Sequence, residues 1–177
     1  MSDARALIES SAEARRRGDR AAARKLANEA AEMSKASRDR KGLGAALAAL
    51  GRLHRDDHDY DAALASYEEA AELARESGDE LALAHRLRHI GDILTEQGQL
   101  SPAEQRYDEA GPIFERLGIG QLAQANFLRS TALLKEKQGE RGAAADLWTM
   151  ARTLYAATGT EAGVQESDRR LANLKTA

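Results

Sequence analysis

The sequence lacks cysteine and contains little proline and few β-branched or aromatic residues. The absence of Cys excludes disulfides, iron–sulfur clusters and thiolate zinc sites. Two prolines leave few helix breakers, and one Val with five Ile leaves little material for strands. In contrast, 37 Ala and 22 Leu residues favour helices. The composition therefore predicts an all-α protein.

Long apolar runs and an excess of one charge are also missing. No stretch approaches the roughly 20 apolar residues that cross a membrane, and the polar first residues are not typical of a signal peptide. The 26 Lys and Arg residues nearly balance 29 Asp and Glu, for a formal net charge of -3. A general nucleic-acid binder is expected to be strongly basic. We therefore expect a soluble cytoplasmic protein that binds neither nucleic acid nor membrane.

A pattern of turn, small and aromatic residues occurs four times along the chain. Its turns begin, in order, at Gly18, His58, Gly98 and Gly139. Small residues follow each turn at fixed distances, as in Ala63 and Ala70 of the second copy. An aromatic residue such as Tyr67 accompanies them in the last three copies, whereas the first copy has Ala27 in its place. The spacing is about 40 residues, and a fixed spacing of this size is typical of repeat proteins.

Apolar residues recur at helical spacing on both sides of each turn. Leu47, Leu50 and Leu53 mark the helix before the second turn, and Tyr67 and Ala70 lie on the helix after it. Each copy is therefore expected to form a helix–turn–helix hairpin. The expected helices span, in order, residues 3–17, 19–36, 41–56, 60–76, 80–97, 101–116, 121–138 and 141–157, with a ninth over 160–175.

Local signals indicate where some of these helices begin and end. His58 stands where the other copies have Gly, which predicts a left-handed backbone conformation. Asp79 is expected to cap the helix that follows it. The segment 101–104, with sequence Ser-Pro-Ala-Glu, has the pattern of a capping box with Pro at the first helical position.

The small and aromatic positions of the middle copies point to a known family. The residues that define the second copy are Leu47, Leu50, Gly51, Ala63, Tyr67 and Ala70. This arrangement resembles the tetratricopeptide repeat, and the resemblance extends over roughly residues 4–156. The spacing near 40 residues resembles the long-helix variety found in kinesin light chains and in bacterial signalling and regulatory proteins.

The resemblance implies a single tetratricopeptide-like domain over residues 1–177. Its fold would be all-α, a right-handed superhelical solenoid of four antiparallel helix hairpins plus a C-terminal capping helix. The repeats cover approximately 3–37, 41–77, 80–117 and 121–157, and the capping helix covers 160–175. A polar outer side suits a cap. The alternative is the first helix of an incomplete fifth repeat that pairs with a second molecule.

The resemblance also implies a concave groove lined by the first helix of each hairpin. Arginines dominate the positions expected there, although the whole chain carries a net charge of -3. The planar guanidinium fork pairs well with carboxylates. The candidate binding residues are Arg52, Arg55, His85, Arg88, Asn126 and Arg129. We hypothesise a groove that binds a peptide with acidic side chains or a free C-terminus. The alternative is a solvated face in which these arginines pair with nearby carboxylates.

The sequence contains no recognisable group of catalytic residues or metal ligands. His85 and His89 lie four residues apart, a spacing that can bind zinc, but no third ligand is evident near them. No phosphate-binding loop and no Ser/His/Asp arrangement can be identified. We therefore expect no enzyme activity, no metal and no cofactor, and we expect a non-catalytic interaction module or scaffold.

Two other functions fit the same sequence. A terminal helix could form a homodimer, which would make the protein a self-assembling structural component. The groove could instead accept a small anionic ligand or a signalling peptide, as in a bacterial-type regulatory sensor. Light scattering with and without residues 160–177 tests the first alternative, and thermal-shift screening with phosphates and dicarboxylates tests the second.

Overall fold

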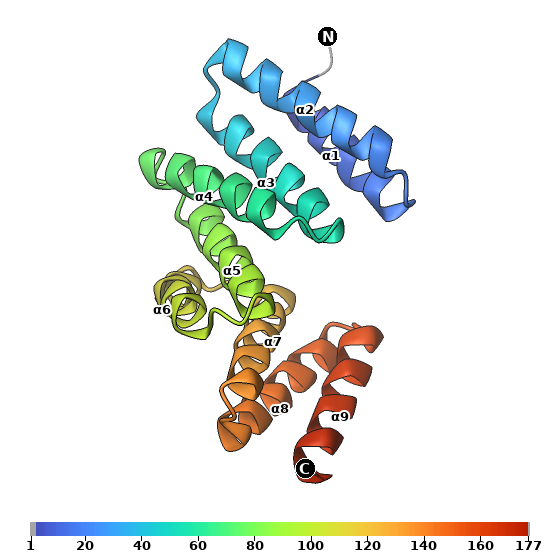
Figure 1. Cartoon of the computed structure of the whole chain (residues 1–177), viewed down its shortest axis with the longest axis vertical. Helices are drawn as coiled ribbons and strands as arrows, with labels where there is room; N and C mark the ends of the chain where they lie inside the picture. The colour runs from blue at the N-terminus through green and yellow to red at the C-terminus, as the bar shows by residue number, and fades with distance from the viewer. Residues whose placement is uncertain (1–2, 177) are drawn as a thin grey trace. The chain divides into compact units, whose positions relative to one another are not determined.

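The computed structural model describes residues 3–176, and over this range the chain forms nine α-helices and no strand (Figure 1). The helices are α1 Ala4–Arg16, α2 Arg20–Ser37, α3 Arg40–Asp56, α4 Tyr60–Glu76, α5 Glu80–Glu96, α6 Leu100–Leu117, α7 Gln121–Lys137, α8 Arg141–Ala157 and α9 Glu161–Thr176. The all-α prediction is confirmed, and every expected helix end is correct to within one residue. No helix in the described range is long and apolar enough to cross a membrane.

The chain divides into two compact units, Met1–Ile93 and Leu94–Ala177. In the first unit, α1 to α4 pack on one another in chain order as antiparallel neighbours (Figure 1). In the second unit, α7 packs on α8, and α8 packs on α9. Helices that pack against each other within a unit are therefore consecutive in the sequence, as in a repeat array. The right-handed superhelix and the single domain over residues 1–177 stay predictions.

The turns between helices depend on residues with positive φ. His58 has φ 60°, which confirms the left-handed conformation predicted for it, and Gly98 has φ 77° in the equivalent turn. A side-chain cap then begins the next helix. The backbone N–H of Ala82 donates to Asp79 Oδ1 at 3.1 Å, so the predicted cap of α5 is confirmed.

The start of α6 differs from the prediction. The helix begins at Leu100, with Gln99 as its N-cap and no side-chain capping bond. The segment 101–104 therefore lies inside the helix, and the predicted capping box is wrong. The turn at Gly98 explains the difference, because it places the next residue at the cap, as His58 does in the repeat before. The repeat register thus overrides a local capping motif.

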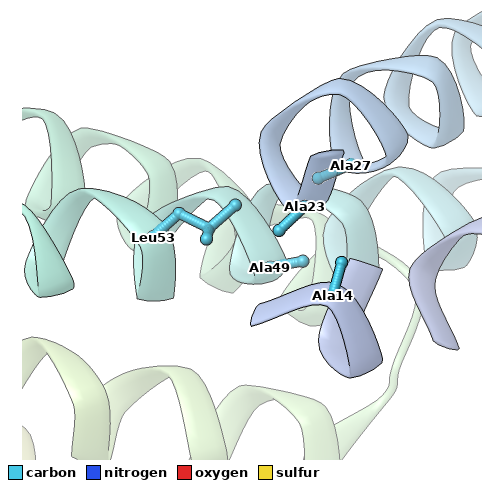
Figure 2. Packing of buried hydrophobic residues seen from close by; sticks show 5 residues of the cluster. All are labelled: Ala14, Ala23, Ala27, Ala49 and Leu53. Atoms are coloured by element: carbon cyan, nitrogen blue, oxygen red, sulfur yellow. The ribbon is translucent and has the colours of Figure 1, made fainter. Parts of the chain in front are cut away.

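Small side chains make up much of the core of the first unit. Ala14 of α1, Ala23 and Ala27 of α2, and Ala49 and Leu53 of α3 point towards one another in one buried cluster (Figure 2). Short side chains let the helix axes approach closely while the interior stays filled. The many alanines of the sequence therefore set the close spacing of these hairpins.

In the second repeat, the aromatic residue Tyr67 packs between three helices. A Cβ atom built on Gly51 of α3 would lie 2.8 Å from Cε2 of Tyr67, so the ring packs directly against the glycine backbone. On the other side, the ring of Tyr67 stacks on His89 of α5 with centroids 4.9 Å apart. Tyr67 thus joins three helices, α3, α4 and α5.

Candidate functional site

The six predicted binding residues lie on first helices of hairpins, in both compact units. They are Arg52 and Arg55 on α3, His85 and Arg88 on α5, and Asn126 and Arg129 on α7. All six are intermediate in exposure, neither fully buried nor fully solvated. The first four belong to the first unit and the last two to the second, so each group is described within its own unit.

In the second unit, both predicted residues are engaged in contacts between helices. Arg129 pairs with Glu166 of α9 through two hydrogen bonds, Nε to Oε2 at 2.6 Å and Nη2 to Oε1 at 2.8 Å. Asn126 Oδ1 accepts a hydrogen bond from the hydroxyl of Tyr155 at 2.8 Å. These side chains therefore connect α7 to α8 and α9, and a partner that bound Asn126 or Arg129 would compete with these internal contacts.

In the first unit, ion pairs connect the first helices of successive hairpins. Arg15 of α1 forms a bidentate pair with Asp56 of α3, with distances of 2.5 and 2.9 Å. This hydrogen bonding holds the pKa of Asp56 below its usual value. Arg55 lies 3.5 Å from Asp92 Oδ2, and Arg88 donates to the same oxygen at 2.9 Å. One carboxylate of α5 therefore serves two guanidinium groups.

These contacts involve a group of arginines on α1, α3 and α5. We call it the arginine cluster, and its members are Arg15, Arg52, Arg55, Arg86 and Arg88. Two carboxylates, Asp56 and Asp92, form ion pairs with this cluster. Five guanidinium groups thus lie in one part of the first unit, in a chain whose formal net charge is -3.

Two members of the arginine cluster form no ion pair or hydrogen bond with any described residue. Burial lowers the pKa of Arg52, and the charges of Arg15 and Arg55 lower it further. Burial also lowers the pKa of Arg86, to about 10, and its Nε atom is buried without a hydrogen-bond partner. Partly desolvated guanidinium groups without a counter-charge are unfavourable, so these two are the strongest candidates for an external anion.

Arg86 was missed by the sequence analysis, although a signal for it exists. The equivalent residue 40 positions earlier is Ala46, which is fully buried at 0% exposure. Arg86 therefore lies on the packing side of its helix and not at one of the positions expected to line a groove. A long charged side chain in a position that holds a buried Ala in the preceding repeat was the available signal.

The two neighbouring histidines of α5 are neutral at neutral pH. Burial lowers the pKa of His85 to about 4 and that of His89 to about 3, and the charge of Arg88 lowers both values further. A ring nitrogen of His89 lies 2.9 Å from Arg88 Nη2. Among the described residues, no three His, Cys, Asp or Glu side chains come together in a group that could hold a metal ion.

Comparisons with known proteins agree with this architecture. Residues 43–116, from α3 to α6, match the model of the tetratricopeptide repeat. This span of the chain carries tetratricopeptide repeats. No curated protein matches it by sequence. Repeats of this family stack as extended arrays, and the surfaces of these arrays generally bind other proteins.

Solved structures resemble the tetratricopeptide-repeat chain over nearly its whole length. BtubC (BKLC) from P. vanneervenii superimposes with a TM-score of 0.71 at 20% identity, covering 98% of this chain and 81% of that one. A Podosopora anserina protein described as a kinesin light chain with nearly identical TPR-like repeats gives 0.70 at 12% identity, covering 97% and 94%. A variant of it gives 0.74 at 13%, covering 96% and 84%. These similarities establish a solenoid fold of the tetratricopeptide type.

Proposed function

We propose that this protein is a non-catalytic interaction module that binds an acidic segment of a partner protein. The observation that supports the proposal is the arginine cluster, in which Arg52 and Arg86 form no ion pair with any described residue and Arg55 and Arg88 share the carboxylate of Asp92. Guanidinium groups pair with carboxylates through charge-assisted hydrogen bonds. An acidic peptide therefore supplies carboxylates for the arginines of this cluster.

The individual contacts indicate which arginines would bind the segment. Arg52 forms no ion pair or hydrogen bond with any described residue. Arg55 lies 3.5 Å from Asp92, whose carboxylate also pairs with Arg88, so Arg55 has further N–H donors for a second acceptor. Arg129, by contrast, has a bidentate partner of its own. We therefore centre the proposal on α3 and α5 and give α7 a lesser part.

The test is the affinity of a fluorescein-labelled decaglutamate peptide, measured by fluorescence anisotropy at low salt. The proposal expects saturable binding to the wild type, and no binding of a decaglutamine peptide with the same label. Arg52→Glu is expected to weaken decaglutamate binding by about tenfold or more, which corresponds to about 1.4 kcal/mol. Its fold should persist, because Arg52 forms no ion pair or hydrogen bond with any described residue.

A matched control separates local recognition from general charge. Arg16→Glu makes the same change at an exposed residue near the end of α1, and it should leave the affinity within about twofold. Equal affinity for the acidic and neutral peptides would contradict the proposal. Equal losses in Arg16→Glu and Arg52→Glu would mean that binding reflects net charge alone.

A further inference from the structure

One position of the repeat carries an arginine on three successive first helices. Arg88 of α5, Arg129 of α7 and Arg169 of α9 follow one another at the spacing of about 40 residues that defines the repeat. Arg88 donates to Asp92 at 2.9 Å. Arg129 forms its bidentate pair with Glu166. Arg169 is exposed and forms no ion pair or hydrogen bond with any described residue, so the third arginine lacks the carboxylate that each of the first two has.

A cavity of about 240 Å³ lies against α9 at this arginine. The side chains that line it come from one face of the helix, and they are Glu166, Arg169, Arg170 and Asn173. Arg169 and Asn173 are exposed, so a ligand can enter the cavity from solvent. Clefts that hold drug-sized ligands begin at about 300 Å³. The cavity on α9 therefore suits one small chemical group and not a large molecule.

The carboxylates beside the cavity already have partners. Both oxygens of Glu166 accept from Arg129, at 2.6 and 2.8 Å. Both oxygens of Glu136 on α7 are also engaged, Oε1 by the indole Nε1 of Trp148 at 2.5 Å and Oε2 by Arg170 Nη1 at 2.9 Å. The second unit therefore satisfies both carboxylates internally.

The guanidinium groups at the cavity, in contrast, keep N–H donors for a ligand. Arg170 uses Nη1 for Glu136 and forms no other hydrogen bond with a described residue. Its guanidinium carbon lies 5.9 Å from the centroid of the Trp148 ring, a contact that holds the group in place. Arg169 has all its donors left. Two guanidinium groups that line one cavity favour an anion there, because an anion accepts charge-assisted hydrogen bonds from both.

We propose that Arg169 and Arg170, with the side-chain amide of Asn173, form a binding site for one oxyanion, which is a phosphate or a carboxylate group. The site lies in the second unit and shares no residue with the arginine cluster, so it goes beyond the proposed function and does not depend on it. Phosphate and carboxylate oxygens match the planar fork of a guanidinium group. The ligand supplies at Arg169 the negative charge that Glu166 supplies at Arg129.

The fluorescence of Trp148 measures binding at this site. Trp148 is the only tryptophan of the chain, and its ring contacts Arg170. Sodium phosphate and sodium succinate are titrated separately at constant ionic strength, with sodium chloride as the blank, so that general screening stays the same. Decaglutamate is the third ligand and supplies the same carboxylate group on a peptide. We expect at least one of the three to change the emission in a saturable way.

Arg169→Met removes one guanidinium group and keeps a long side chain. The affinity for the oxyanion should fall about tenfold or more, because charge-assisted hydrogen bonds are lost. The melting temperature of the free protein should not change, because Arg169 forms no ion pair or hydrogen bond in the described part of the chain. Arg16→Met makes the same change at an exposed residue of α1 and should leave both quantities as they are.

Asn173→Asp tests the site in the opposite way, because it places a carboxylate in the cavity itself. Arg169 lies four residues earlier on the helix and can pair with this carboxylate. The new charge should therefore compete with the ligand and lower its affinity about tenfold. Asn28→Asp makes the same change at an exposed residue of α2, and it should leave the affinity within about twofold.

The outcomes identify the source of the oxyanion or reject the site. A saturable change with phosphate or succinate that Arg169→Met weakens supports a site for a free anion. The same behaviour with decaglutamate alone means that a peptide supplies the carboxylate. The site is wrong if none of the three ligands changes the emission of Trp148, or if Arg169→Met and Asn173→Asp bind as tightly as the wild type. The acidic-segment proposal stands or falls separately, through the anisotropy of decaglutamate with Arg52→Glu.

Discussion

Replacing Gly51 by Ala would place a methyl group against the ring of Tyr67. The added Cβ would lie 2.8 Å from Cε2 and 2.9 Å from Cδ2 of that ring. Carbon atoms in contact prefer about 3.5–4.0 Å, so either the ring or the helix has to move. The ring has little freedom, because it is fully buried and stacks on His89.

Two opposing terms set the expected change in the free energy of unfolding. Overpacking a filled interior costs about 1–3 kcal/mol. Replacing Gly by Ala inside a helix returns up to about 1 kcal/mol of helix propensity. The overpacking term is larger because the neighbour is a rigid ring held on both sides. We therefore expect Gly51→Ala to destabilise the protein by about 1–2 kcal/mol, which lowers the melting temperature by roughly 2–8 °C.

Thermal unfolding followed by circular dichroism measures this effect, with Gly142→Ala as the control. A Cβ atom on Gly142 of α8 would meet nothing within 4 Å, so only the propensity term applies and the melting temperature should stay the same or rise. The two variants change the same residue type in a helix and should therefore shift the temperature in opposite directions. Equal stabilisation by both would refute the close packing of Tyr67 on α3.

Three other perturbations follow from the structure. Because burial lowers the pKa of His85 to about 4 and of His89 to about 3, the unfolded chain takes up protons on these residues below about pH 6.5 before the folded chain does. The free energy of unfolding should therefore fall between pH 6.5 and 4, by at most about 1.4 kcal/mol per histidine per pH unit; the melting temperature should fall with it, and replacing both residues by Gln should flatten this dependence. A double-mutant cycle on Arg129 and Glu166 should give a coupling energy of about 1 kcal/mol, because the pair is bidentate and partly shielded. Deleting residues 160–177 uncovers the apolar side of α8 and should lower the melting temperature, whereas light scattering of the full chain should report a monomer if α9 is a cap.

The helices could be predicted from the sequence because four copies constrain one another. A single amphipathic stretch leaves its ends uncertain by several residues, but equivalent turns such as His58 and Gly98 define all ends together. Local capping signals were less consistent: Asp79 does cap α5, but the segment 101–104 gave the wrong start for α6. Here the repeat register was a better guide than local capping chemistry.

The candidate site was less predictable, because its ion pairs join distant parts of the chain. The sequence indicated that arginines gather on the first helices, and the structure does place Arg52, Arg55 and Arg88 in the arginine cluster. It did not indicate that Arg55 meets Asp92, 37 residues away. It also did not point to Arg86, because its position is a packing position in the preceding repeat. Partners of this kind depend on how one hairpin packs on the next.

The NMR signals of the Arg86 and Arg52 side chains test most directly whether these two arginines bind an acidic peptide. In protein labelled with ¹⁵N at arginine, each Nε–H signal reports its own hydrogen bonding as unlabelled decaglutamate is added. We predict that both signals shift and saturate together with the anisotropy curve, while the signal of Arg129 stays in place. Saturable peptide binding with both signals unmoved would contradict recognition by these two arginines.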